Sequence, residues 1–388
     1  MKQTYDVAAY VWPAYTGDEP RARMFWKEGD GEWQSVRNAR ENGRDKPADY
    51  VWDRKPLWGY VNEADPQVME MEIQCAWEHG VNVFIYDWYW YDDRPFLENC
   101  LNDGYLKAGN NHLVKFYLMW ANHDATHMWN IDLSDELNKE VIWRGDVTFD
   151  IFKKLVRRWI EKYFSHPSYY KIDGKPLFMF YMMKPLLVGL GGTEGVRVAL
   201  DYFRKEAVKA GFPGLHLQAA FNAFEGFDYD GRYGGTAGDL YTLLGLDSVS
   251  HYNMGKRVER NKDYTSYILD HKAAYDAMDA AGRVYFPQVS LGWDNNPRYR
   301  KFKPQIIKNN TPENIKKALL QAKEYVDTHD LPAPLVIINS WNEWTETSYL
   351  QPDNLYGYGY LEAVKNVFRE DLQETLPVKG GVEGADSP

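Results

Sequence analysis

The stretch Asp65–Tyr86, DPQVMEMEIQCAWEHGVNVFIY, contains one complete helix–strand unit. Asp65 is a helix-capping residue type, and Pro66 fits the first helical turn after it. Apolar residues then recur at helical spacing until Gly80 ends the pattern. Residues 81–86 are almost all apolar or aromatic, which is typical of a strand buried on both faces of a parallel sheet. The stretch therefore predicts an amphipathic helix followed by a buried parallel strand.

The same unit recurs along the whole chain, because short apolar runs alternate with helical patterns. The eight predicted strands are Tyr5–Val11, Val81–Tyr86, Val114–Met119, Leu177–Met182, Leu215–Phe221, Asp247–Tyr252, Val284–Ser290 and Pro334–Asn339. Eight such units predict an α/β fold, a single (β/α)8 TIM barrel with a long, aromatic-rich first βα loop. An open doubly wound sheet is the main alternative, but its usual glycine-rich phosphate loop does not follow the first predicted strand.

The predicted first loop, residues 14–63, is too long for an ordinary connection between a strand and a helix. Loops of this length are usually functional, so we expect it to form a wall of a cleft. Its aromatic residues include Phe25, Trp26, Trp33, Trp52 and Trp58. We expect residues 1–377 to form one catalytic domain. Residues 378–388 are rich in Gly, with Pro and Ser, and are predicted to be a disordered tail.

Bulk composition excludes several classes of protein. The net charge of -11 argues against a nucleic-acid partner, which needs a basic surface. No apolar stretch is long enough to span a membrane. Cys75 and Cys100 are too few for a disulfide framework and are expected to be free thiols. No signal region precedes the first strand, so we expect a cytoplasmic protein, or a periplasmic or extracellular one whose signal was removed. The oligomeric state stays open.

Aromatic and polar residues gather directly after the predicted strands, where a barrel of this type has its active site. Tyr and Trp combine a flat apolar face with a polar edge, which matches the C–H face and hydroxyl rim of a sugar. We therefore predict a carbohydrate cleft, with an oligo- or polysaccharide as the partner. The predicted substrate-binding residues are Trp12, Tyr15, Asp87, Trp88, Tyr89, Trp120, Asn122, His123, Asp124, Asn222, Tyr252, Trp293, Asp294, Asn342 and Trp344.

The sharpest motif is WNEWTE, residues 341–346, after the eighth strand. Glu343 and Glu346 are three residues apart, so a helical turn would place both on one face. Cleavage of a glycosidic bond uses two neighbouring carboxyl groups, and each raises or lowers the other's pKa. We predict these two as the catalytic residues. The alternative is a helix capping box, because Ser340 precedes Glu343 by three positions.

Three weaker patterns suggest metals. Asp228-Tyr229-Asp230 has the form used by metal-dependent sugar transferases, but acids in a glycine-rich turn are common. His123 and His127 have no third ligand of a known pattern, and Asp92-Asp93 and Asp294-Asn295-Asn296 are typical of loop-capping acids. We therefore predict no metal and no cofactor.

The chain resembles glycoside hydrolase family 99 and the related WbsX-type family. The resemblance runs from residues 10–13 (YVWP) to 358–361 (YGYL), and it is strongest at residues 341–346. It implies a barrel and retaining, endo-acting cleavage of α-mannosidic linkages without a metal. By this analogy Glu346 is the general acid and base. Glu343 would take the proton of the sugar's own 2-hydroxyl, which attacks C1 to form a 1,2-anhydro sugar.

Two residues depart from the family pattern. Thr347 stands where a Gly is usual, and Gln351 stands where a Glu is frequent. Attack by the 2-hydroxyl requires it to be trans to the leaving group, so we expect an α-manno- or α-rhamno-configured glycan. A WbsX-type glycosyltransferase of polysaccharide biosynthesis and a catalytically silent glycan-binding protein are the competing functions.

Overall fold

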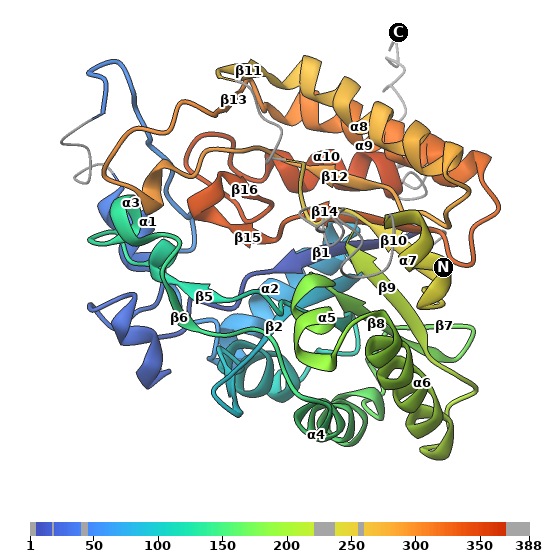
Figure 1. Cartoon of the computed structure of the whole chain (residues 1–388). Coiled ribbons are helices and arrows are strands. Elements are labelled where there is room, and N and C mark those ends of the chain that lie inside the picture. The colour runs from blue at the N-terminus through green and yellow to red at the C-terminus, as the bar shows by residue number, and fades with distance from the viewer. Residues whose placement is uncertain (1–4, 18, 40–45, 221–236, 255–259, 370–388) are drawn as a thin grey trace, which may run out of the picture.

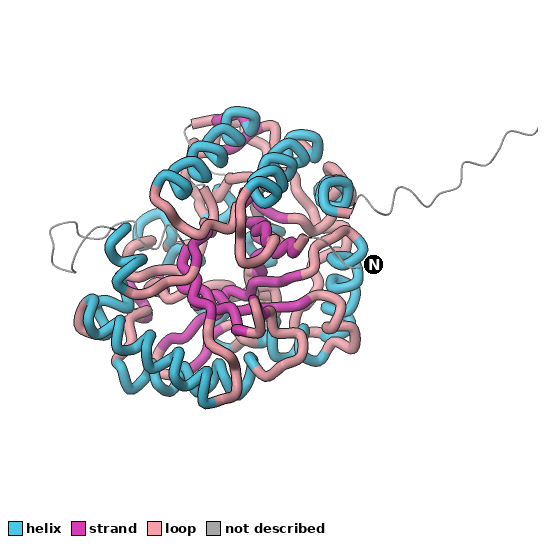
Figure 2. The backbone as a smooth tube through the Cα atoms, turned by 90° about the vertical axis from the view of Figure 1, so that its right-hand side faces the viewer, coloured by secondary structure: helices cyan, strands magenta, loops and turns pink. Residues whose placement is uncertain are grey.

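The computed structural model describes residues 5–17, 19–39, 46–220, 237–254 and 260–369. Within these ranges, eight parallel strands form a nearly closed barrel. The strands are β1 (Asp6–Val11), β2 (Val83–Tyr91), β4 (Lys115–Trp120), β8 (Lys175–Phe180), β9 (His216–Ala220), β10 (Ser248–Ser250), β12 (Gln288–Ser290) and β14 (Leu335–Asn339). Their order around the sheet is β10-β9-β8-β4-β2-β1-β14-β12. Figure 2 shows the strands as an inner ring with helices outside it. The predicted fold class is confirmed.

The ring closes through a joint between β10 and the segment just before β12. One parallel bridge joins Val249 to Tyr285. It is made by backbone bonds from Val249 N to Val284 O (2.9 Å) and from Phe286 N to Val249 O (3.1 Å). Two side-chain bonds reinforce it, from Ser250 Oγ to Phe286 O (2.8 Å) and between His251 Nδ1 and Tyr285 Oη (2.9 Å). We call this joint the seam.

Side-chain caps start several of the outer helices, and the sequence predicts the one at Asp65. Asp65 accepts a hydrogen bond from Gln67 N at the start of α2, and Thr148 accepts one from Ile151 N at the start of α4. Such caps satisfy backbone donors that the first helical turn leaves free. The helices are α2 (Pro66–Glu78), α4 (Phe149–Trp159), α5 (Lys184–Leu190), α6 (Thr193–Lys209), α7 (Ala237–Leu243), α8 (Tyr264–Ala280), α9 (Pro312–Thr328) and α10 (Gly359–Phe368).

The long first loop contains the short helix α1 (Trp33–Asn38). A second short helix, α3 (Ser134–Leu137), comes from a later part of the chain and lies beside α1 (Figure 1). The loop is fixed to the end of the first strand, because Glu32 N donates to Ala14 O (3.0 Å) and Glu63 N donates to Tyr15 O (3.1 Å). The loop therefore packs over the C-terminal end of the barrel. The predicted tail, residues 378–388, lies outside the described residues, and no described helix is long and apolar enough to cross a membrane.

Candidate active site

A small cavity opens at the C-terminal end of the barrel. Seven of the predicted site residues line it: Trp12, Asp87, Tyr89, His123, Tyr252, Glu343 and Glu346. Six further residues line it that the sequence did not single out as site residues: Met119, Ala121, Met128, Trp129, Tyr181 and Arg298. Its volume of about 60 Å³ is well below the roughly 300–1,000 Å³ of common ligand pockets, so this conformation admits only part of a sugar.

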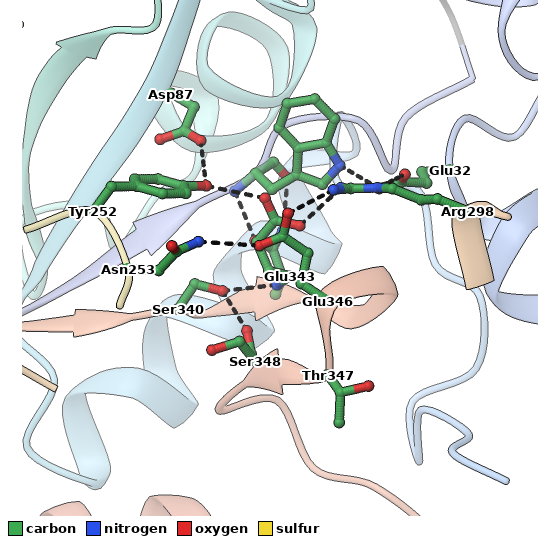
Figure 3. Close-up of polar contacts among 12 residues, drawn as sticks. Glu32, Asp87, Tyr252, Asn253, Arg298, Ser340, Glu343, Glu346, Thr347 and Ser348 are labelled. Atoms are coloured by element: carbon green, nitrogen blue, oxygen red, sulfur yellow. Dashed lines mark hydrogen bonds and ion pairs between the residues drawn. The ribbon is translucent and has the colours of Figure 1, made fainter. Parts of the chain in front are cut away.

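Arg298 lies at the centre of the polar contacts in this cavity (Figure 3). Its Nη1 donates to Glu346 Oε1 (2.7 Å) and its Nη2 donates to Glu343 Oε2 (3.0 Å). Nε donates to Glu32 Oε1 (2.8 Å), and Glu32 Oε2 accepts a further bond from Trp12 Nε1 (2.6 Å). A single guanidinium therefore brings both predicted catalytic carboxyl groups together and is itself held by the first loop.

The segment that carries the two glutamates is not the helical turn that we expected. Glu343 ends the short strand β15 (Asn342–Glu343), and Glu346 ends a 3-10 turn over Trp344–Glu346. Ser340 Oγ does accept a bond from Glu343 N (2.8 Å), which is half of a capping box. The Glu343 carboxylate, however, binds Tyr252 and Arg298. Both carboxyl groups lie on the same side of this turn and contact Arg298.

The two departures from the family pattern have structural explanations. Thr347 has a φ of +57°, a left-handed conformation that Gly adopts without strain. Its hydroxyl accepts a bond from Trp52 Nε1 (3.0 Å) and donates to Asp294 O (3.2 Å). Gln351 accepts from Trp344 Nε1 (2.6 Å) and donates to Glu63 Oε1 (3.1 Å). An amide can do both, whereas a carboxylate at position 351 would face the Glu63 carboxyl group.

Burial controls the charge of the cavity. It raises the pKa of Glu343 well above the ordinary value; the Glu346 charge raises it further and Arg298 lowers it. Burial also raises the pKa of Asp87, although the hydrogen bond from Tyr252 acts to lower it. Burial thus disfavours the charged form of both carboxyl groups, and at Glu343 the Arg298 cation opposes this effect.

Trp88 and Trp120 require a correction, because the structure does not place them in the cavity. Both are buried, and both pack against Trp159 of α4, with ring centroids 5.4 Å and 5.3 Å from it. Trp88 also donates to Glu98 Oε1 (2.7 Å). Side chains alternate along a strand, so Trp88 points away from the side to which Asp87 and Tyr89 point. These two tryptophans belong to the layer between barrel and helices.

Trp120→Ala is therefore expected to destabilise the protein by about 3–5 kcal/mol, the usual cost of removing a large core side chain. Trp129→Ala removes a ring that lines the cavity and is expected to weaken glycan binding instead. Urea unfolding and glycan titration of both variants separate the two effects. Loss of glycan affinity in a stable Trp120→Ala protein would contradict this placement.

The other predicted residues support the site from outside the cavity. Asn342 donates to Trp12 O (2.9 Å), Asn122 donates to Met182 O (2.7 Å), and Asp124 accepts from Gly145 N (2.7 Å). The Tyr15 ring packs on Trp33, and the Trp344 ring stacks on Tyr349.

Two predicted residues lie away from the cavity. Trp293 packs on the core, and Asp294 lines a separate groove of about 660 Å³ with Tyr50, Trp52 and Thr347. Asn222 and Asp228–Asp230 lie outside the described residues.

A second pair of buried acids lies behind the catalytic segment. Glu63 accepts bonds from Asn342 Nδ2 (2.9 Å) and Gln351 Nε2, and Glu72 accepts one from Trp341 Nε1 (2.8 Å). Burial raises the pKa of Glu72 from 4.5 to about 7 and also raises that of Glu63. Since the folded protein holds the proton of Glu72 more tightly than the unfolded chain does, stability falls as pH rises from 4.5 through 7.

We expect Glu72 to contribute on the order of 3 kcal/mol to this fall in the free energy of unfolding, and Glu72→Gln to reduce the fall by that amount. Urea unfolding at pH 5 and pH 8 measures it. The matched control is Glu78→Gln, an exposed position on the same helix, which should keep the wild-type pH dependence. Equal pH dependence in Glu72→Gln and wild type would show that Glu72 is not the group responsible.

Comparison with known proteins places the chain among glycan-related families. A model of the family described as "Glycosyltransferase WbsX" matches residues 7–364. Two curated relatives from strains of Xanthomonas campestris pv. campestris, both named "Uncharacterized protein WxcX", are 26% and 25% identical over 354 residues. The alignments cover 89% of this chain and 47% of each relative. The chain therefore spans about half the length of the curated relatives it matches.

Solved structures share the fold at low sequence identity. The GH99 endo-alpha-mannosidase from Bacteroides thetaiotaomicron has a TM-score of 0.56 and 13% identity, with coverage of 95% of this chain and 97% of that one. A structure described as "Glycoside hydrolase-like protein" has a TM-score of 0.58 and 14% identity, with coverage of 95% and 94%. These similarities show a common barrel fold.

Proposed function

This chain belongs to the family described as Glycosyltransferase WbsX, and we propose that it is a retaining glycoside hydrolase that cleaves α-manno- or α-rhamno-configured glycans internally. The observation that carries the proposal is the pair Glu343 and Glu346, buried together on one guanidinium in a cavity with aromatic walls. Two neighbouring carboxyl groups are what cleavage of a glycosidic bond uses.

The proposed reaction has two steps. In the first, Glu343 takes the proton of the 2-hydroxyl, O2 bonds to C1, the C1–oxygen bond to the leaving group breaks, and Glu346 gives its proton to the departing oxygen. In the second, Glu346 takes a proton from water, the water oxygen bonds to C1, the C1–O2 bond breaks, and Glu343 returns its proton to O2. Two inversions at C1 give net retention. The ion pair with Arg298 supports the role of Glu343 as a base, because a cation lowers the pKa of the carboxyl group against the effect of burial.

The charge of the cavity favours hydrolysis over sugar transfer from a nucleotide, which the family's description suggests. Among the described residues that line it, Arg298 is the one arginine or lysine, and it already binds Glu32, Glu343 and Glu346. A nucleotide diphosphate would bring further negative charge to a site where Glu32, Glu343 and Glu346 already share this one cation. A neutral glycan carries no such cost.

The test is incubation with defined α-mannans and rhamnose-containing oligosaccharides, with NMR of the first products. We expect shorter glycans whose new reducing ends have the α configuration of the substrate. Metal-dependent binding of a sugar nucleotide without hydrolysis of any glycan would instead support a transferase. Glycan binding without turnover, unchanged in Glu346→Gln, would support a binding protein.

A further inference from the structure

The hydroxyl group of Tyr252 lies between two carboxyl groups. Its oxygen is 2.9 Å from Asp87 Oδ2 and 3.0 Å from Glu343 Oε1 (Figure 3). The ring is fixed by Tyr10 and Tyr181, with centroids 4.7 Å and 5.2 Å away. Tyr252, Asp87 and Glu343 are all buried.

A phenol has one proton, so Tyr252 can donate to only one of these two oxygens at a time. If both carboxyl groups were ionised, the other contact would set lone pairs against lone pairs in a buried site. Both contacts are favourable only when one carboxyl group is protonated and donates to the Tyr252 oxygen. The geometry therefore requires a proton on Asp87 or on Glu343.

The surroundings of the two acids favour Asp87 as the protonated group. Glu343 has a second contact to Arg298, and a cation stabilises the ionised form of a carboxyl group. Asp87 Oδ1 is buried, and the described residues give it no hydrogen-bond partner, an arrangement that penalises a carboxylate much more than a neutral acid. The charged groups around Asp87 and Glu343 are Glu346, Glu32 and Arg298, and Glu346 further disfavours a charge on Asp87.

We propose that Asp87 is a positioning residue that acts in its protonated form: it donates to Tyr252, and Tyr252 then donates to Glu343. The directed hydrogen bond keeps Glu343 a carboxylate. The role of this charge in removing a proton from the sugar rests on the proposed function. The protonation of Asp87 does not.

Infrared difference spectroscopy of the free protein tests the protonation directly. Subtracting the Asp87→Asn spectrum from that of wild type at neutral pH should show the carbonyl stretch of a protonated carboxylic acid. Glu98→Gln is the matched control and should show no such band, because burial acts to raise the pKa of Glu98 but Arg158 holds it below the ordinary value. A difference spectrum with only carboxylate bands would overturn the proposal. No substrate is needed, so this result stands even if the protein hydrolyses no glycan.

The pH profile of kcat/KM tests the link to Glu343, because its acid limb reports the pKa of the base in the free enzyme. Tyr252→Phe removes a hydrogen bond to the charged form and should move this limb up by about 1 pH unit. Tyr10→Phe, whose hydroxyl donates to His251 O, is the matched control and should leave the limb in place. An unmoved limb in Tyr252→Phe would contradict the link.

Asp87→Asn gives a second reading from the same profile. The amide that this substitution introduces can donate to Tyr252 as a protonated acid does. The acid limb of the kcat/KM profile should therefore stay at its wild-type pH, even if the value of kcat/KM itself changes. If Asp87 were ionised, its removal would delete a negative charge near Glu343 and lower the limb. A downward shift would therefore overturn the proposal.

Discussion

Glu343→Gln and Glu346→Gln are each expected to lower kcat by about 10²-fold or more, the usual scale for acid–base groups. The two losses should differ in their dependence on the leaving group. A glycoside with an acidic phenol as leaving group needs no proton at its oxygen, so it should recover much of the activity of Glu346→Gln. It should recover little in Glu343→Gln, where the 2-hydroxyl still lacks its base. Rates on paired aryl and oligosaccharide substrates measure this.

Circular dichroism of both variants checks that the fold is intact. Near-full activity of either variant on the oligosaccharide would remove that residue from the mechanism. Equal recovery of both variants by the aryl glycoside would show that the roles are assigned wrongly.

Arg298→Met is expected to lower the free energy of unfolding by about 3–5 kcal/mol, the scale for breaking a buried ion pair from one side. Arg298 is 4% exposed and holds Glu32, Glu343 and Glu346, which would be left as neighbouring buried carboxyl groups. Because protonation removes that repulsion, the loss should shrink as pH falls. Urea unfolding at pH 5 and pH 8 measures both effects.

The matched control is Arg300→Met, two residues along the chain. Arg300 pairs with Asp132 at the surface, with 45% of its side chain exposed, so its loss should cost less than about 1 kcal/mol. Arg298→Lys should not restore stability fully, because an ammonium group lacks the planar set of donors that reaches three carboxyl groups. A stable Arg298→Met protein would show that the carboxyl groups are already neutral without the arginine.

The barrel could be predicted because its signal is local. Each buried strand is a continuous apolar run, and each helix has a cap and a periodic stripe, as in Asp65–Tyr86. Each of the eight predicted strands overlaps an observed one, although the bounds differ by several residues at β2 and β12. The position of Glu343 and Glu346 after the last strand followed from the same pattern.

The contacts of the site could not be predicted in the same way. Arg298 lies in a polar stretch without periodicity, and Glu32 lies in the long loop; only folding brings them to Glu343. The location of Trp88 was predictable in principle. Strand β2 continues to Tyr91 rather than ending at Tyr86, and the alternation along it separates Trp88 from its neighbours. The predicted functions of Asp87, Tyr252 and the two glutamates stay predictions until the variants are measured.

The seam has a consequence for how this barrel can diversify. Tyr252 and Asn253, which contact Glu343 and Glu346, directly follow β10 on one side of it. Elsewhere the ring is joined by longer backbone ladders that no side-chain replacement removes. At the seam, the Ser250 and His251 side chains add hydrogen bonds to a single backbone bridge. We therefore expect point mutations at these two positions to change the spacing of the strands beside Tyr252 and Asn253, while the other strands keep their register.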